Sequence, residues 1–542
     1  MMPFLFALLF ANAPDERLEC DWIIINARIY TVDSAFSMAQ AMAIDDGYIM
    51  EIGKTDSILA HYWSLNVSDL EGKPVYPGFI DGHCHFLHYG VDLNYTDLTN
   101  TTSYYDVIER LKKHDIAKTG GWVIGRGWDQ NDWEIKEFPS REALDKVFPE
   151  TPVYIERVDG HAALINGRAM QLLEINEQSQ VAGGIVEVKM GKCTGILLDN
   201  AMELAKKKMP TKSKTFLTTA LLRAQQDCFA VGLTSVQDAG LELYELLAIK
   251  AADEANKLKM RVYAMATPDT KTFNYLLENG QIQTAHLKVQ SFKFYCDGAL
   301  GSRGAGLLKP YSDDPENTGI YYFTPDSFQF MAQRVYNMGF QLCTHAIGDS
   351  ANRFTLNTYA SILQGQNDLR WRIEHCQVVD KSDLPKFGQY DILPSVQPVH
   401  ATSDMYWAID RLGPERIKNA YAYKDLMKQN GMYIGGSDFP VENIDPLYGF
   451  YAAVARKDRK NYPDKGFQKD QAVLRTDALK AMTIWAAYGS FEESVKGSLE
   501  ANKYADFVIL DKDILAIPEP ELLTVKVLKT VVGGEVVYDA EK

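Results

Sequence analysis

Short strand-like runs of apolar and β-branched residues occur at both ends of the chain. Residues 21–53 contain the segments WIIINARIYTV and AMAIDDGYIMEIG, and KPVYPG follows at 73–78. Near the other end, DFVIL and VKVLKTVVGGEVVY have the same pattern of apolar and β-branched residues, with Gly533-Gly534 as a hairpin turn. Such runs, bounded by turn residues, predict strands. We therefore expect residues 20–76 and 497–542 to form one small composite β-sandwich domain.

The pattern changes between these two ends. Apolar segments such as VGLTSV, LKVQSFKFY, GFQLCTHA and MYIGGS alternate with helical ones such as TPDSFQFMAQRVYNMG. That alternation is typical of βα units around a parallel sheet, which predicts an α/β domain over residues 77–496. Residues 101–230 interrupt it with the charged, aromatic-rich stretch GWVIGRGWDQNDWEIKEFPSREAL, and we expect an insertion that covers a site.

Composition excludes several classes of protein. The chain has 542 residues, 46% hydrophobic and 24% charged, as in a soluble globular protein. Its 56 Lys and Arg against 72 Asp and Glu give a net charge of −16, which argues against nucleic-acid binding as the main task. The seven cysteines are scattered and form no C-x-x-C pair, so they indicate neither a disulfide scaffold nor a zinc ribbon.

The first residues, MMPFLFALLFANA, suggest a targeting segment. An apolar run precedes Ala11-Asn12-Ala13, which has the form of a signal-peptidase site, and this predicts a signal peptide at 1–13. Three sequons, at Asn66, Asn94 and Asn100, agree with the secretory pathway or the extracellular space. The alternative is an uncleaved apolar N-terminus on a cytoplasmic protein. The run is shorter than the ~20 residues of a membrane span, and no other stretch resembles one.

Metal-binding residue types lie where predicted strands end. His83 and His85 follow the strand-like VYPGFI, and alternate strand residues point to the same side. His345, His375 and Asp438 end the strands FQLCTHA, WRIEHC and MYIGGSD. Side chains at the carboxyl ends of barrel strands converge on one mouth. Imidazoles plus a carboxylate are what a hydrolytic zinc centre requires.

The spacing agrees with this interpretation. His345 and His375 are 30 residues apart, about one βα unit, and Asp438 follows 63 residues later, about two. Any one of these histidines alone is better explained by a hydrogen-bonded core position, but four histidines and one aspartate, all at strand ends, favour a metal site. Lys293, in VQSFKFYCDG, is a strand lysine with either a structural or a chemical role.

Five motifs carry a family resemblance: PGFIDGHCH, KFYCDGALGSRGA, THAIGDSANR, RIEHCQ and GGSDFPVE. From about residue 20 onward the chain resembles the amidohydrolase superfamily, in particular its YtcJ-like branch, which includes N-substituted formamide deformylases. The resemblance implies a (β/α)8 TIM-type barrel flanked by a β-sandwich, with two metal ions, expected to be Zn²⁺. It implies that His83 and His85 bind one ion, that His345 and His375 bind the other, and that a carboxylated Lys293 bridges them. Asp438 would ligate the first ion and act as general base.

Four further residues are candidates for substrate binding. His161 in VDGHAALINGRAM follows the strand PVYIERV, and His400 in SVQPVHATSD follows another. Arg126, with Asp129 in GRGWDQ, either orients substrate or fixes the insertion. Arg303 lies in DGALGSRGAG, which lacks the ending of a phosphate loop and predicts a flexible site loop. Trp122, Trp128 and Trp133 are better explained as core than as a pocket lining.

Three hypotheses about function follow. The first is a metal-dependent hydrolase that cleaves a non-peptide C–N bond in an amide, N-formyl amine or N-acyl amine. The second keeps the barrel and uses one zinc with Lys293 unmodified. The third is a secreted binding protein without turnover, which the complete ligand set disfavours. We expect a small-molecule substrate and leave homo-oligomerisation open.

Overall fold

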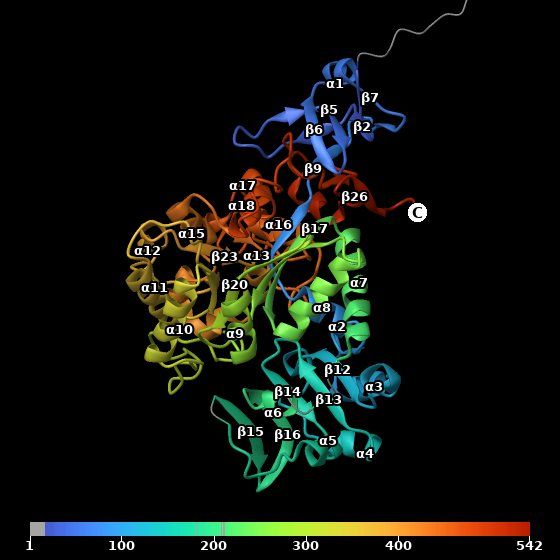
Figure 1. The fold of residues 1–542 in the computed structure, drawn as a ribbon. Helices are drawn as coiled ribbons and strands as arrows, with labels where there is room; N and C mark the ends of the chain where they lie inside the picture. Colours follow the sequence, from blue (N-terminus) through green and yellow to red (C-terminus); the bar gives the residue numbers. More distant parts are fainter. Residues whose placement is uncertain (1–16, 182, 207–208, 210–211) are drawn as a thin grey trace, which may run out of the picture.

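The computed structural model describes residues 17–181, 183–206, 209 and 212–542. The predicted signal peptide at 1–13 lies outside these residues. Within the described ranges, no helix is both long and apolar enough to cross a membrane. Figure 1 shows three parts along the molecule: a β domain at the top, a central barrel and a second β region at the bottom.

Eight parallel strands form a nearly closed barrel in the order β10-β17-β18-β20-β21-β22-β23-β24. They are β10 (Phe79–Cys84), β17 (Leu233–Leu241), β18 (Arg261–Ala266), β20 (Leu287–Tyr295), β21 (Gln341–Ala346), β22 (Arg372–His375), β23 (Leu393–Val396) and β24 (Ile434–Gly435). Backbone hydrogen bonds from Asp438 N to His83 O, 2.7 Å, and from His85 N to Phe439 O, 2.8 Å, join the first strand to the last. The expected TIM-type barrel is confirmed.

Helices follow the strands and cover the barrel, as Figure 1 shows. They include α2 (Phe86–Asp92), α7 (Lys214–Ala230), α8 (Leu243–Glu254), α9 (Thr270–Asn279), α10 (Pro325–Asn337), α11 (Asp349–Leu363), α15 (Tyr423–Asn430) and α16 (Pro446–Ala455). N-cap residues begin several of them. The Thr324 hydroxyl accepts a hydrogen bond from Ser327 N, with Pro325 as the first residue of α10, and Asp269 caps α9. Further helices follow β22, β23 and β24: α12 (Pro385–Gln389), α13 (Pro398–Asp404), α14 (Ala408–Arg416), α17 (Arg475–Ala481) and α18 (Ile484–Gly489).

The two chain ends share a β-sandwich. One sheet holds β2 (Trp22–Ile25), β5 (Ala41–Asp45), β6 (Tyr48–Gly53) and β8 (Val67–Asp69); the other holds β3 (Arg28–Tyr30), β4 (Met38–Ala39), β9 (Pro74–Pro77), β25 (Phe507–Leu510), β26 (Val527–Val532) and β27 (Glu535–Asp539). The C-terminal strand β25 pairs with β9. Trp22, Val75 and Phe507 pack in the core between the sheets. Gly533 and Gly534 have φ of 55° and 74°, the left-handed backbone that the β26–β27 turn requires.

The region between α2 and α7 is a separate six-stranded sheet. It contains β11 (Thr96–Asp97), β12 (Val123–Trp128), β13 (Val153–Arg157), β14 (Ala162–Ile165), β16 (Lys192–Asp199) and β15 (Gly184–Lys189), with α3 (Tyr104–Leu111), α4 (Glu142–Val147), α5 (Gly167–Leu173) and α6 (Met202–Lys206). We call residues 96–206 the insertion. Trp122, Trp128 and Trp133 are buried in its two cores, as expected for packing residues. Helix α7 packs on α2 and β17 of the barrel; the exact domain limits stay predictions.

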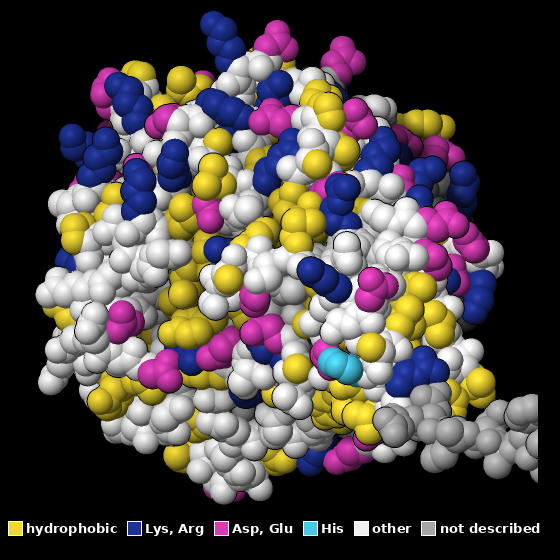
Figure 2. All heavy atoms as spheres, turned by 90° about the horizontal axis from the view of Figure 1, so that it is seen from above, with side chains coloured by type: hydrophobic (Ala, Val, Ile, Leu, Met, Phe, Trp, Pro, Cys, Tyr) yellow, Lys and Arg dark blue, Asp and Glu magenta, His cyan; other side chains and the backbone are white. Residues whose placement is uncertain are grey.

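Figure 2 shows the face of the molecule that is seen from above. Lys and Arg side chains are dispersed there among Asp and Glu side chains, without a continuous basic area.

Candidate metal centre

The six candidate metal-binding side chains come from five strands and meet at the carboxyl end of the barrel. His83 lies on β10, and His85 follows it at the start of α2. Lys293 and His345 lie within β20 and β21, and His375 is the last residue of β22. Asp438 lies three residues after the end of the short strand β24. This is the convergence that the spacing predicted.

The distances between these side chains are short. Nε2 of His85 lies 3.2 Å from Oδ1 of Asp438, and Nε2 of His83 lies 3.5 Å from the same oxygen. Lys293 Nζ lies 3.2 Å from His83 Nε2. The imidazole ring centroids of His345 and His375 are 4.5 Å apart, and those of His83 and His375 are 4.9 Å apart. All six groups therefore surround one small volume.

His375 and Asp438 adopt an unusual backbone conformation. Their φ angles are 75° and 63°, a left-handed region that residues other than glycine rarely occupy. Strain of this kind concentrates at functional sites, where the surrounding structure holds a side chain in a required direction. Here it turns both side chains toward the centre at the point where their strands end.

The donor set fits a divalent cation. Within the described residues, Nε2 of His345 and Oδ1 of Asp438 are buried and have no hydrogen-bond partner. Ligand atoms of His83, His375 and Asp438 all lie within 4.8 Å of one another. Imidazole nitrogen and carboxylate oxygen are the ligands that zinc and similar ions take, and buried polar atoms without partners are otherwise costly.

Burial sets the protonation of these groups. It lowers the pKa of His83 to about 4, helped by the nearby Lys293 ammonium, so this imidazole is neutral and its Nε2 lone pair is free. Burial likewise lowers the pKa of Lys293 to about 8. Burial alone would raise the pKa of Asp438, but the contact with Nε2 of His85, 3.2 Å away, and the other nearby imidazoles outweigh burial and hold this pKa well below its usual range. Asp438 is therefore an anion at neutral pH.

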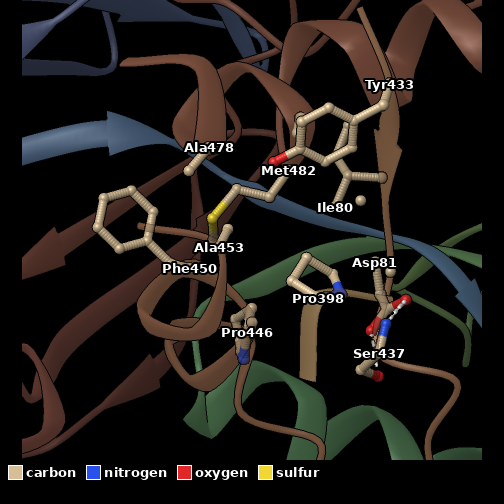
Figure 3. Close-up of a pocket in the computed structure, with 14 residues that line it drawn as sticks. Ile80, Asp81, Pro398, Tyr433, Ser437, Pro446, Phe450, Ala453, Ala478 and Met482 are labelled. Carbon is tan, nitrogen blue, oxygen red and sulfur yellow. Dashed lines mark hydrogen bonds between the residues drawn. The ribbon is translucent and has the colours of Figure 1, made fainter. Parts of the chain in front are cut away.

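A buried carboxylate joins the first and last strands directly behind the centre. Asp81 on β10 accepts hydrogen bonds from Ser437 Oγ at 2.6 Å and from the backbone N–H groups of Ser437 and His83, each at 3.1 Å. Figure 3 shows this contact at one end of a small apolar pocket lined by Ile80, Pro398 and Met482, of about 30 Å³. The pocket is too small for a substrate. Its Asp81 fixes the backbone from which His83 and Asp438 project.

A much larger cavity, of about 2380 Å³, opens in front of the centre. Its walls come from the barrel mouth and from the insertion, as expected for a segment that covers a site. Of the predicted substrate residues, His161, Arg126 and His400 line it. Arg303 is not among the lining residues; its guanidinium pairs with Asp313 at 2.9 Å.

The three lining residues are held by specific partners. Nδ1 of His161 is 2.9 Å from Asp199 Oδ1, and burial is outweighed by this contact, which raises the pKa of His161. His400 Nδ1 accepts from Gln377 Nε2 at 3.1 Å, which leaves its Nε2 at 3.9 Å from Asp438 Oδ2. Arg126 pairs with Asp92 of α2 at 2.9 Å.

Two parts of the site were not predicted. His88 lines the cavity and pairs with buried Glu245 at 3.2 Å. Its position one helical turn after His85 was the available signal. Glu374, one residue before His375, accepts from Nδ1 of His83 at 2.6 Å. Nothing in the sequence indicated that this strand residue points into the barrel toward β10.

Comparisons with known proteins agree with this geometry. The model described as "Amidohydrolase family" matches residues 66–538. The chain belongs to the amidohydrolase family. It is 30% identical to the Bacillus subtilis protein YtcJ, which is named as an amidohydrolase, over 94% of this chain and 98% of that protein. The N-substituted formamide deformylase of Arthrobacter pascens is 26% identical over 96% of this chain and 98% of its own length.

A solved structure shows the same fold. A metal-dependent hydrolase of Pyrococcus horikoshii, described as uncharacterized, matches with a TM-score of 0.78 and 30% identity, over 92% of this chain and 99% of that one. The resemblance expected from the five motifs is thereby confirmed. So is the expectation of an enzyme, a metal-dependent amidohydrolase on a TIM-type barrel.

Proposed function

We propose that this amidohydrolase cleaves a non-peptide C–N bond in an amide, an N-formyl amine or an N-acyl amine. The observation that carries the proposal is the convergence of four histidines, Lys293 and Asp438 at one barrel mouth, within a family of metal-dependent hydrolases. The deformylase relative acts, by its name, on N-substituted formamides, and supports this choice of bond.

In this proposal the chain binds two zinc ions. His83, His85 and Asp438 would hold one, His345 and His375 would hold the other, and Lys293, as a carbamate, would be shared between them. The amine of Lys293 would add CO₂ through a new N–C bond and release one proton to solvent water. Its lowered pKa, about 8, favours this step because the reaction requires the neutral amine.

When bound, the ions supply a Lewis acid that lowers the pKa of water and polarises the scissile carbonyl. Asp438 accepts the proton of the attacking water on Oδ2 and later delivers it to the leaving nitrogen. Nδ1 of His85 donates to Ala239 O at 3.0 Å, which leaves Nε2, 3.2 Å from Oδ1 of Asp438, available to the same ion. His400, with Nε2 at 3.9 Å from Oδ2, lies on the side from which the proton arrives.

Substrate contacts are assigned to the cavity walls. His161 presents its ring from the insertion, where the Asp199 contact fixes one ring nitrogen and leaves the other for a substrate oxygen. Arg126 and His400 line the same space. Because the cavity is larger than the roughly 300–1,000 Å³ of usual ligand pockets, it admits an acyl or amine group of considerable size.

A second candidate is a hydrolase with one zinc and an unmodified Lys293. One specific observation favours it: His83, His375 and Asp438 by themselves place ligand atoms within 4.8 Å of one another. Three protein ligands and an open position are a common arrangement for a catalytic zinc ion. The same barrel thus offers either stoichiometry.

Elemental analysis and an amine-release assay test the proposal together. We expect about two zinc ions per chain, and release of amine from N-formyl and N-acyl amines that stops on chelation and returns with zinc. The variant D438N should bind substrate and lose turnover. One ion per chain with activity would support the second candidate. No bound metal after incubation with zinc and bicarbonate would overturn both and favour a binding protein.

A further inference from the structure

The interior of the barrel contains a charged pair where barrels normally pack apolar side chains. Arg372 and Glu374, both on β22, are 0% exposed. Arg372 Nε donates to Glu374 Oε1 at 2.6 Å, and Nη2 of the same arginine donates to Oε2 at 2.9 Å. Layers of branched apolar residues are the usual filling at this depth. The pair therefore requires an explanation.

Stability is a poor explanation. Removing two charges from water costs several kcal/mol per ion, and apolar side chains of similar volume are often equal or better. The remaining hydrogen bonds of Arg372 lie inside the barrel and not at the surface of the protein. Two of them cross the barrel, to Gly82 O at 2.8 Å on β10 and to Gln237 Oε1 on β17, and a third reaches Ser395 Oγ at 3.0 Å on the neighbouring strand β23.

The contacts lead to one metal-ligand candidate. Oε2 of Glu374 accepts a 2.6 Å hydrogen bond from Nδ1 of His83, whose side chain is also 0% exposed. β10 and β22 are not neighbours in the sheet, so this bond spans the barrel interior. With the proton on Nδ1, the lone pair of His83 lies on Nε2, which faces Lys293 and Asp438.

We propose that Arg372 and Glu374 act as a positioning pair that holds His83 as its Nδ1–H tautomer and aims Nε2 at the metal. The inference rests on the proposed metal centre. Arg372 is needed because both carboxylate oxygens of Glu374 must be fixed before one of them can orient an imidazole. Gly82 O, the carbonyl preceding His83, is held by the same guanidinium, so ring and backbone are oriented together.

The main test uses E374Q, since an amide can donate as well as accept and no longer forces the proton onto Nδ1. We expect zinc affinity, measured by competition with a chelator, to fall by about 10- to 100-fold. In the metal-free protein, long-range ¹H–¹⁵N correlations of labelled histidine should show His83 as Nδ1–H in the wild type and as a mixture in E374Q.

The matched control is D506N. Asp506 also receives two hydrogen bonds from a buried arginine, Arg261, at 2.6 and 3.0 Å, and it lies away from His83. This variant should retain wild-type zinc affinity. Equal losses in D506N and E374Q, or an affinity of E374Q within threefold of the wild type, would overturn the proposal.

A double variant, R372M/E374L, guards against misfolding of the single one. It replaces the pair by apolar groups of similar size, so it should fold with a Tm near that of the metal-free wild type and still bind zinc weakly. If neither variant folds, the pair serves the fold and the proposal fails. If the wild-type chain binds no zinc, the proposed function is wrong. The tautomer of His83 in the metal-free protein still tests the positioning role on its own.

Discussion

Arg126 of the insertion lies 2.9 Å from Asp92 of the barrel helix α2. Its Nε is also 3.7 Å from Glu156, which in turn pairs with Lys206 at 3.2 Å and accepts from Tyr154 at 2.9 Å. Alternating charges thus connect α2, β12, β13 and α6 along one wall of the cavity. The arginine joins the covering segment to the barrel mouth beside the metal centre.

Removal of this arginine should loosen the insertion. In R126A the carboxylates of Asp92 and Glu156 lose their shared cation, and we expect a loss of about 1–2 kcal/mol in unfolding free energy because both are only partly exposed. Limited proteolysis should cut the insertion faster than in the wild type. R141A is the control, since Arg141 pairs with Asp145 inside the insertion. Equal cleavage of both variants would show that Arg126 does not join the two parts.

Lys293 gives the second prediction. K293A should lose activity, because no carbamate can form, and short-chain carboxylic acids should restore part of it by occupying the vacated bridging position. K288A is the control: Lys288 is on the same strand, but its ammonium donates to Phe491 O at 3.0 Å outside the barrel. Full activity of K293A with one zinc ion per chain would support the single-zinc candidate.

The sequence was sufficient to predict the candidate metal ligands at the strand ends. It was insufficient to predict which residues hydrogen-bond to those ligands. Strand periodicity and βα spacing bring His83, His345 and His375 to one mouth, since parallel strands all end on the same side. The contact from Glu374 to His83 crosses the barrel between strands that are not adjacent, and depends on closure and register. Likewise, the flexible loop expected at Arg303 gave no indication that Asp313 turns this side chain away from the cavity.

Asp404 makes stability depend on pH. Burial raises the pKa of this cavity residue to about 7, although His400 and the Tyr421 hydroxyl oppose the shift. A carboxyl group with a higher pKa in the folded state binds more protons there, so the stability it contributes is lost as the pH rises from about 4 to about 7. D404N should remove this slope and be more stable than the wild type at pH 8, by about 2–4 kcal/mol.

Y421F separates the titration of Asp404 from its hydrogen bond. This variant keeps the carboxyl group and loses the 2.8 Å contact from the tyrosine hydroxyl, so the slope should persist. Denaturant unfolding at intervals between pH 5 and 8 provides the measurement. A D404N profile parallel to that of the wild type would contradict the prediction.

His345 distinguishes the two metal stoichiometries. Its Nε2 has no hydrogen-bond partner within the described residues, and it does not belong to the group formed by His83, His375 and Asp438. If two ions are bound, H345A should lower the zinc content from about two to about one per chain and abolish amine release. H286A is the control, because His286 pairs with Asp253 at 2.8 Å away from the cavity. A zinc content of one in both the wild type and H345A would mean that the three-residue group holds a single ion, and that His345 serves the substrate instead.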